Sequence, residues 1–200
     1  MRQAFGKSEK GLHLKNQDAF FINREKGLFA VADGVTLSKN SEKASRTAID
    51  ALKGFDGNIE RFFFGVNEKV RKLKDGTTTL TVASIKNNIL EVGHVGDSSL
   101  FLMRNKIKKI TEDDSIEGSN ILTQAMGMER IKPHFYRMRI KKGDVLLLAT
   151  DGVAKYIGEK EVLHVLEERL ERVPQQLIQI AKKKPKLYED DKTVVVVKIV

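Results

Sequence analysis

The chain of 200 residues carries 36 lysines and arginines against 27 aspartates and glutamates, and it contains no cysteine. The absence of cysteine excludes disulfides, thiolate nucleophiles, iron–sulfur clusters and cysteine-ligated zinc. With 40% hydrophobic residues the chain can fold around a core, but its apolar runs are too short to cross a bilayer, and its first residues lack the apolar stretch of a secretory signal. We therefore expect a single domain over residues 1–200 that is cytoplasmic, monomeric and not bound to a membrane.

The formal net charge of +9 raises the question of nucleic-acid binding. The basic residues are scattered, and their densest runs, at residues 106–109, 137–142 and 182–184, have no aromatic residues interleaved with them. This pattern is typical of a solvated surface. A basic nucleic-acid binder is therefore the third-ranked interpretation, and no nucleic-acid partner is expected.

Short segments rich in valine, isoleucine, phenylalanine and threonine, bounded by glycine, asparagine or aspartate, predict β-strands. In chain order these are residues 19–23, 28–32, 77–85, 89–95, 99–104, 106–110, 145–150 and 193–200. Lys86-Asn87-Asn88 and Arg104-Asn105-Lys106 are typical of hairpin turns between neighbouring strands.

Apolar residues at helical spacing predict helices between these strands. The first begins at Ser41, which can cap it, and ends at Gly54. The others cover residues 59–73, 159–173 and 174–184. The order of the predicted elements is not a βαβ repeat: it runs from two strands to two helices, a meander of hairpins, two more helices and a last strand. This order predicts an α+β fold with mixed or mainly antiparallel sheets and helices on the outside.

Acidic residues, usually beside glycine, stand at the ends of several predicted strands. Asp33, Asp97 and Asp151 follow strands, whereas Asp190 and Asp191 precede the last one. In an antiparallel arrangement these ends can meet at one edge of the sheets, where the carboxylates would repel one another. A hard divalent cation such as Mg²⁺ or Mn²⁺ removes that repulsion and prefers oxygen ligands. A single Asp-Gly is more often a turn than a ligand, so this prediction depends on the number of such sites and their shared context.

A series of short motifs runs along the chain. They lie at residues 16–20 (Asn-Gln-Asp-Ala-Phe), 31–34 (Val-Ala-Asp-Gly), 42–45, 76–78 (Gly-Thr-Thr), 94–98 (His-Val-Gly-Asp-Ser), 111–115, 122–127, 143–152 and 190–193. In this order they resemble the metal-dependent serine/threonine protein phosphatases of the protein phosphatase 2C (PPM) family. Each motif is weak alone, but the ordered set is specific. The resemblance implies a four-layer α-β-β-α sandwich, with two mainly antiparallel sheets flanked by helices and a metal cluster at one edge.

The resemblance also implies a set of metal ligands. Asp33 would bridge two ions, Mn²⁺ or Mg²⁺, and Gly34 would offer its carbonyl oxygen. Asp151 and Asp190 would complete the shell of one ion. Asp97 would contribute to a third, looser ion.

The implied catalytic residues are Asp33, Asp151, Asp190 and Asp18, the last acting through a water on the metal. The implied reaction is in-line attack on phosphorus by a water whose pKa two ions lower, with no covalent intermediate on the protein. The implied partner and substrate is a protein phosphorylated on serine or threonine.

The sequence departs from the family pattern near these motifs. His13 stands where relatives usually carry the arginine that binds phosphate, and Lys15 could supply a point charge, so both are candidates for phosphate binding. Ser38 stands where relatives have the histidine proposed to protonate the leaving group. The flap region around 111–127 is shortened, which would leave the site open to a folded phosphoprotein. The runner-up interpretation is accordingly a phosphatase-like regulatory module that binds a phosphoprotein with little or no turnover.

Overall fold

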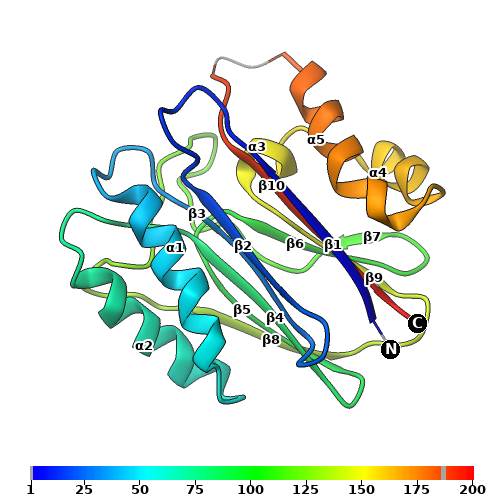
Figure 1. The fold of residues 1–200 in the computed structure, drawn as a ribbon, viewed down its shortest axis with the longest axis horizontal. Coiled ribbons are helices and arrows are strands. Elements are labelled where there is room, and N and C mark those ends of the chain that lie inside the picture. Colours follow the sequence, from blue (N-terminus) through cyan, green and yellow to red (C-terminus); the bar gives the residue numbers. More distant parts are fainter. Residues whose placement is uncertain (1, 186–187) are drawn as a thin grey trace.

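Two five-stranded sheets form the centre of the protein, and helices cover their outer faces (Figure 1). The computed structural model describes residues 2–185 and 188–200. Every pairing between the named strands is antiparallel. The predicted α+β sandwich of two antiparallel sheets flanked by helices is confirmed.

The two sheets are built from strands that are far apart in the sequence. The first sheet has the order β1 (Arg2–Glu9), β10 (Lys192–Ile199), β9 (Val145–Ala149), β6 (Ser99–Met103) and β7 (Ile107–Lys109). The second has the order β2 (Asp18–Asn23), β3 (Leu28–Asp33), β4 (Leu80–Lys86), β5 (Ile89–Val95) and β8 (His134–Arg139).

The central strands are buried on both faces, which explains their uninterrupted apolar sequences. In β3, Phe29 belongs to the core between the sheets, whereas its neighbour Ala30 packs beneath the helices of the second sheet. In β9, Leu146 lies in the core between the sheets and Leu147 packs beneath the helices of the first. Successive side chains of a strand point to opposite faces, so one strand contributes to two cores.

Each sheet carries its own group of helices. The helical segments are α1 (Ser41–Ala51), η1 (Leu52–Gly54) and α2 (Ile59–Arg71) on the second sheet, and α3 (Asp151–Ala154), α4 (Glu159–Leu166), η2 (Leu170–Arg172) and α5 (Val173–Lys183) on the first. Helix α2 begins where the Asn58 side chain accepts a hydrogen bond from the Arg61 amide at 2.9 Å. None of the helices in the described part of the chain combines the length and the apolar character that crossing a membrane requires.

The sequence analysis misses the two edge strands β1 and β8. Strand β1 pairs along its whole length with β10, yet it carries charged residues such as Lys7 and Glu9. Strand β8 pairs with β5 and contains Arg137 and Arg139. An edge strand is only partly covered, so it tolerates polar residues. These residues interrupt the apolar pattern by which strands are predicted from the sequence.

Two further predictions about local structure are wrong. The predicted helix over 159–173 is interrupted, because Arg169 has an extended backbone between α4 and η2. This break lets Val165 and Val173 reach the same core cluster. The strand predicted from Thr77 begins at Leu80, because Thr78 instead forms isolated bridges to Gly34 and Met126 beside the candidate site.

Candidate active site

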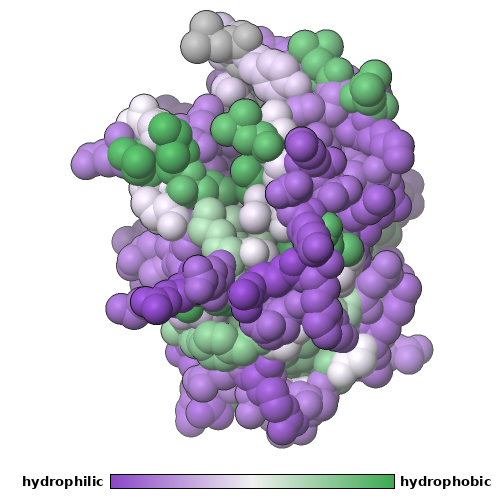
Figure 2. Space-filling view, turned by 90° about the vertical axis from the view of Figure 1, so that its left-hand side faces the viewer, coloured by the Kyte–Doolittle hydropathy of each residue, from purple (hydrophilic) through white to green (hydrophobic). Residues whose placement is uncertain are grey.

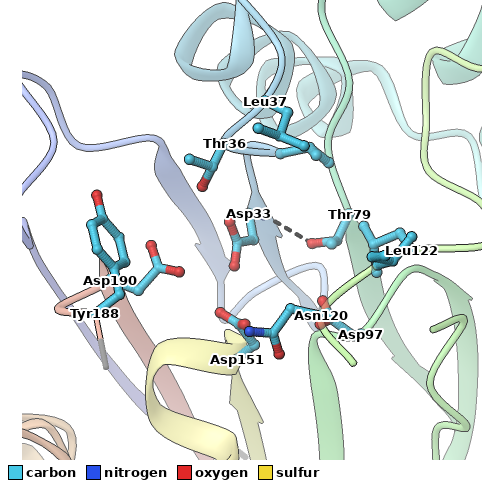
Figure 3. Close-up of a pocket in the computed structure, with 12 residues that line it drawn as sticks. Asp33, Thr36, Leu37, Thr79, Asp97, Asn120, Leu122, Asp151, Tyr188 and Asp190 are labelled. Carbon is cyan, nitrogen blue, oxygen red and sulfur yellow. Dashed lines mark hydrogen bonds between the residues drawn. The ribbon is translucent and has the colours of Figure 1, made fainter. Parts of the chain in front are cut away.

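The ends of the central strands bring acidic side chains to one edge of the two sheets (Figure 3). Asp33 ends β3, and Asp18 begins β2 directly opposite it in the ladder. Asp97 lies between β5 and β6, Asp151 begins α3 just after β9, and Asp190 precedes β10. The structure therefore brings together the carboxylates that the sequence motifs single out.

Four of these side chains, all but Asp18, line a cavity of about 400 Å³. Its acidic lining residues are Asp33, Asp97, Asp151 and Asp190, and its large apolar ones are Val35, Leu37, Ile121, Leu122 and Tyr188. Leu37 and Ile121 are also exposed to solvent, at 97% and 63%. Figure 2 shows hydrophobic groups, in green, among a mainly hydrophilic surface on one face of the molecule. The cavity thus offers both carboxylate oxygens and apolar contacts to a ligand.

Backbone contacts hold Asp33 in place at the centre of the acidic group. Its amide donates to Thr79 Oγ1 at 2.9 Å, and its carbonyl accepts from the Thr79 amide at 2.8 Å. A side chain on the following residue, Gly34, would place its Cβ 2.6 Å from the Ser41 carbonyl oxygen, so only glycine fits there. Burial, followed by the charge of Asp18, raises the pKa of Asp33 well above its ordinary value.

Asp18 is supported by two hydroxyls. Thr150 Oγ1 and Thr193 Oγ1 donate to its Oδ2 atom at 2.9 and 2.7 Å. Its Oδ1 atom is buried and has no hydrogen-bond partner among the described residues. Burial raises the pKa of Asp18 in spite of these hydroxyls, and Asp191 and Asp151 add to the rise. The sequence analysis misses Thr150 and Thr193, although each lies within one of the motifs.

Asp151 and Asp97 share a lysine that the sequence analysis also misses. Lys155 Nζ donates to Asp151 Oδ2 at 2.7 Å and to Asp97 Oδ2 at 3.1 Å. Burial alone would lower the pKa of Lys155, but these carboxylates raise it above its ordinary value. Burial and the charge of Asp151 raise the pKa of Asp97 to about 6, against the opposing effect of Lys155. The Oδ1 atom of Asp151 is buried without a hydrogen-bond partner in the described part of the chain.

Asp190 lies beside one of the two predicted phosphate-binding residues. His13 Nε2 is 3.3 Å from Asp190 Oδ1, and the His13 ring packs edge-on against Tyr188 with 5.4 Å between ring centroids. Burial and the charge of Asp151 raise the pKa of Asp190. His13 touches the cavity only through Asp190 and is not itself a lining residue. The other candidate, Lys15, lies away from the cavity: its side chain is 73% exposed, and its ammonium pairs with Glu42 at 3.0 Å.

Asp191 has a different role from its neighbour. Ligand atoms of His13, Asp190 and Asp191 lie within 4.8 Å of one another. However, the two Asp191 oxygens accept hydrogen bonds from the amides of Gly11 and Gln17, at 2.6 and 2.7 Å. Asp191 therefore fastens the loop before β2 and is less available to a metal than the acidic residues of the cavity.

The donor set of this edge fits a hard cation. It consists of carboxylate oxygens that are mostly desolvated and that raise one another's pKa values, and buried oxygens of Asp18 and Asp151 have no hydrogen-bond partner within residues 2–185 and 188–200. Oxygen ligands of this kind suit Mg²⁺ and Mn²⁺. Without a cation the same arrangement is costly, because like charges are concentrated away from water.

Comparisons with known proteins point to one family. A family model described as Protein phosphatase 2C matches residues 65–186. The serine/threonine protein phosphatase PstP of Mycobacterium tuberculosis is 25% identical over 197 residues, which cover 80% of this chain and 38% of PstP. The chain thus spans less than two fifths of that relative. The serine/threonine phosphatase stp of Listeria innocua is 24% identical over 198 residues, covering 78% of this chain and 79% of stp.

Solved structures share the whole fold. PppA, described as a key regulatory component of T6SS in Pseudomonas aeruginosa, superimposes with a TM-score of 0.89 at 23% identity, covering 100% of this chain and 98% of PppA. The catalytic domain of PstP in complex with 2 manganese ions has a TM-score of 0.83 at 24% identity, with the same coverage of 100% and 98%. The ordered motifs, the sandwich and the match of the family model together establish that this chain belongs to the protein phosphatase 2C family.

Proposed function

We propose that the protein is a metal-dependent phosphatase that hydrolyses phosphoserine and phosphothreonine in proteins. The observation that carries this proposal is the convergence of Asp33, Asp151 and Asp190 on one cavity, beside buried oxygens of Asp18 and Asp151 that have no hydrogen-bond partner in the part of the chain that the structure describes. Membership of the family supports the same reaction, and PstP has been solved with manganese in its catalytic domain.

The metal ligands we propose are the acidic residues at the sheet edge. Asp33 would lie between two ions, with the carbonyl of Gly34 beside it, and Asp151 and Asp190 would bind from the opposite sheet. Bound Mn²⁺ or Mg²⁺ would supply activation of a water and neutralisation of charge on the phosphoryl group. Asp18 would contribute through a water, because its Oδ2 atom is already held by Thr150 and Thr193.

The chain's own residues would place the substrate. His13 can donate a hydrogen bond to a phosphate oxygen from its position beside Asp190. Lys15 is the weaker candidate for phosphate binding, because its ammonium is paired with Glu42. Leu37, Ile121 and Leu122 would contact the residues that flank the phosphorylated side chain. Because the flap region around 111–127 is short, the cavity would admit a folded phosphoprotein.

We further propose that residues 1–200 act as one phosphatase domain, monomeric and cytoplasmic, with proteins and not nucleic acids as partners. Ion pairs of the surface support this, since basic residues there pair with acidic neighbours, for example Lys53 with Asp50 and Lys109 with Asp113.

A second candidate function is a phosphoprotein-binding module with little turnover. The hydroxyl of Ser38, at the position of the histidine in relatives, donates to the Asp75 carbonyl at 2.6 Å and accepts from the Thr77 amide at 2.9 Å. Ser38 therefore fastens its own loop and is not free to protonate a leaving group. This favours slow turnover of substrates whose leaving group needs a proton.

Phosphate release from p-nitrophenyl phosphate and from a phosphothreonine peptide, with Mn²⁺ and then with chelator, tests the two candidates. For the phosphatase we expect metal-dependent turnover that Asp33→Asn and Asp151→Asn each abolish. The matched control is Asp50→Asn, an exposed residue of α1 paired with Lys53, which should keep full activity. Metal-dependent thermal stabilisation without turnover would instead favour the binding module.

A further inference from the structure

Lys155 occupies the centre of a small cage of oxygen atoms. Its Nζ atom lies 2.7 Å from Asp151 Oδ2, 3.1 Å from Asp97 Oδ2 and 3.0 Å from Asn120 Oδ1. These oxygens come from three separate parts of the chain: the start of α3, the connection between β5 and β6, and the segment before Ile121. Asp97, Asn120 and Asp151 all line the cavity (Figure 3).

The position of Lys155 follows from a short helix. Lys155 is the residue directly after α3 and lies four residues beyond Asp151, so its side chain can fold back on the carboxylate at the start of the helix. The ammonium has three protons to donate and no acceptor. The three oxygens of the cage therefore satisfy it completely, and its side chain remains only 35% exposed.

An ammonium and a divalent ion compete for such a cage. A bound Mg²⁺ or Ca²⁺ draws oxygen ligands to between about 2.0 and 2.6 Å, and Lys155 Nζ already stands at hydrogen-bond distance from the same oxygens. An ion bound to both Asp97 Oδ2 and Asp151 Oδ2 would occupy the position of the ammonium, because Lys155 Nζ lies 3.1 and 2.7 Å from these two atoms.

We propose that Lys155 takes the place of the third divalent ion, so that this protein binds two ions and not three. The inference rests on the proposed function, since it assumes that Asp33, Asp151 and Asp190 hold metal. Lys155 supplies a single, permanently tethered positive charge at the edge of the cavity, independent of the metal concentration.

This placement also makes Lys155 a positioning residue for Asp151. The ammonium holds Asp151 Oδ2, and the other oxygen of the same carboxylate is buried with no hydrogen-bond partner among the described residues. Lys155 therefore fixes the Asp151 carboxylate through Oδ2, and Oδ1 remains available to one of the two proposed divalent ions.

The test is to count Mn²⁺ ions per chain by native mass spectrometry and isothermal titration calorimetry. The proteins compared are the wild type, Lys155→Met, Lys155→Arg, Asp97→Asn and the double variant Lys155→Met with Asp97→Asn. Lys160→Met, a lysine exposed on α4 and outside the cavity lining, is the matched control for loss of one charge. Thermal unfolding in chelator verifies that each variant is folded.

We expect two ions in the wild type, in Lys160→Met and in Lys155→Arg, which keeps the charge. Lys155→Met should bind a third, weaker ion, and the additional Asp97→Asn change should remove it. Asp97→Asn alone should still bind two, the same number as the wild type, and this comparison tests the proposal even if Lys155→Met does not fold, because loss of an ion on Asp97→Asn would show that Asp97 holds a third ion.

Two results would overturn the inference while leaving the proposed function intact: three ions in the wild type, or the same count and affinities in Lys155→Met as in the wild type. No bound Mn²⁺ in the wild type would overturn the proposed function as well.

Discussion

Asp18 and Asp33 stand directly opposite each other on the antiparallel strands β2 and β3, with both carboxylates largely withdrawn from water. Side chains directly opposite in a ladder point to the same face, and like charges there are destabilising. Burial raises the pKa of both groups, and neighbouring carboxylates add to the rise: Asp18 for Asp33, and Asp191 and Asp151 for Asp18. A divalent cation bound between these strands would offset the repulsion between the two carboxylates.

Metal binding should stabilise the fold. An ion that binds only the folded protein adds about 2.7 kcal/mol at a concentration of 100 times Kd, which for a chain of this length raises the melting temperature by roughly 5 to 10 °C. We expect Mn²⁺ to produce this rise in thermal unfolding of the wild type and Asp151→Asn to reduce it by more than half. An equal rise in both proteins would show that the ions bind somewhere else.

The same clustering predicts an unusual pH dependence of the metal-free protein. A carboxyl whose folded pKa is raised favours the folded state while protonated, and its contribution is lost as pH rises through the folded pKa. For Asp97, with a pKa of about 6, the loss falls between about pH 4 and pH 6. In chelator, the melting temperature of Asp97→Asn should therefore rise relative to that of the wild type as the pH increases through this window.

The control for this pH experiment is saturating Mn²⁺. Metal binding requires deprotonated carboxylates, so added Mn²⁺ should stabilise the wild type more at neutral pH than near pH 4. A constant difference between Asp97→Asn and the wild type across the window would contradict the prediction.

Thr150 should affect the metal site without touching an ion. Thr150→Val keeps the shape of the side chain but removes the hydroxyl that donates to Asp18 Oδ2 and accepts from the Thr193 amide. Loss of such outer hydrogen bonds typically weakens metal binding by about 10-fold or more. Calorimetric titration with Mn²⁺ measures the effect, with Thr47→Val on α1 as the matched control. Unchanged Mn²⁺ affinity in Thr150→Val would argue against a role of Asp18 near the ions.

His13 and Lys15 can be separated by kinetics. Neither residue lines the cavity, but His13 lies beside Asp190, which does, whereas Lys15 is paired with Glu42. We expect His13→Ala to raise KM for a phosphopeptide by about 10-fold, which corresponds to roughly 1.4 kcal/mol, with a smaller change in kcat. Lys15→Ala should change KM by less than about 2-fold, in keeping with the low value of an exposed ion pair. The reverse order of effects would make Lys15 the phosphate-binding residue.

The family, the sandwich class and the acidic residues of the cavity could be predicted from the sequence. The reason is local: an apolar strand that ends in Asp-Gly, as at Asp33 and Asp151, carries its signal within a few neighbouring residues. Buried central strands such as β9 and β10 can be predicted in the same way, because their apolar residues are continuous in the sequence.

Other features were decided by tertiary structure alone. Edge strand β1 has no apolar run and exists because β10 offers it a complete ladder. Nothing in the local sequence distinguishes Lys155 from the other lysines. Its contacts with Asp97 and Asn120 form only when the chain folds. Lys15 lies close to His13 in the sequence, yet the fold turns it toward Glu42 and away from the cavity. Local sequence determines which groups are available and which segments become buried, whereas the pairing of charges depends on contacts between distant segments, and these arise only when the two sheets close on each other.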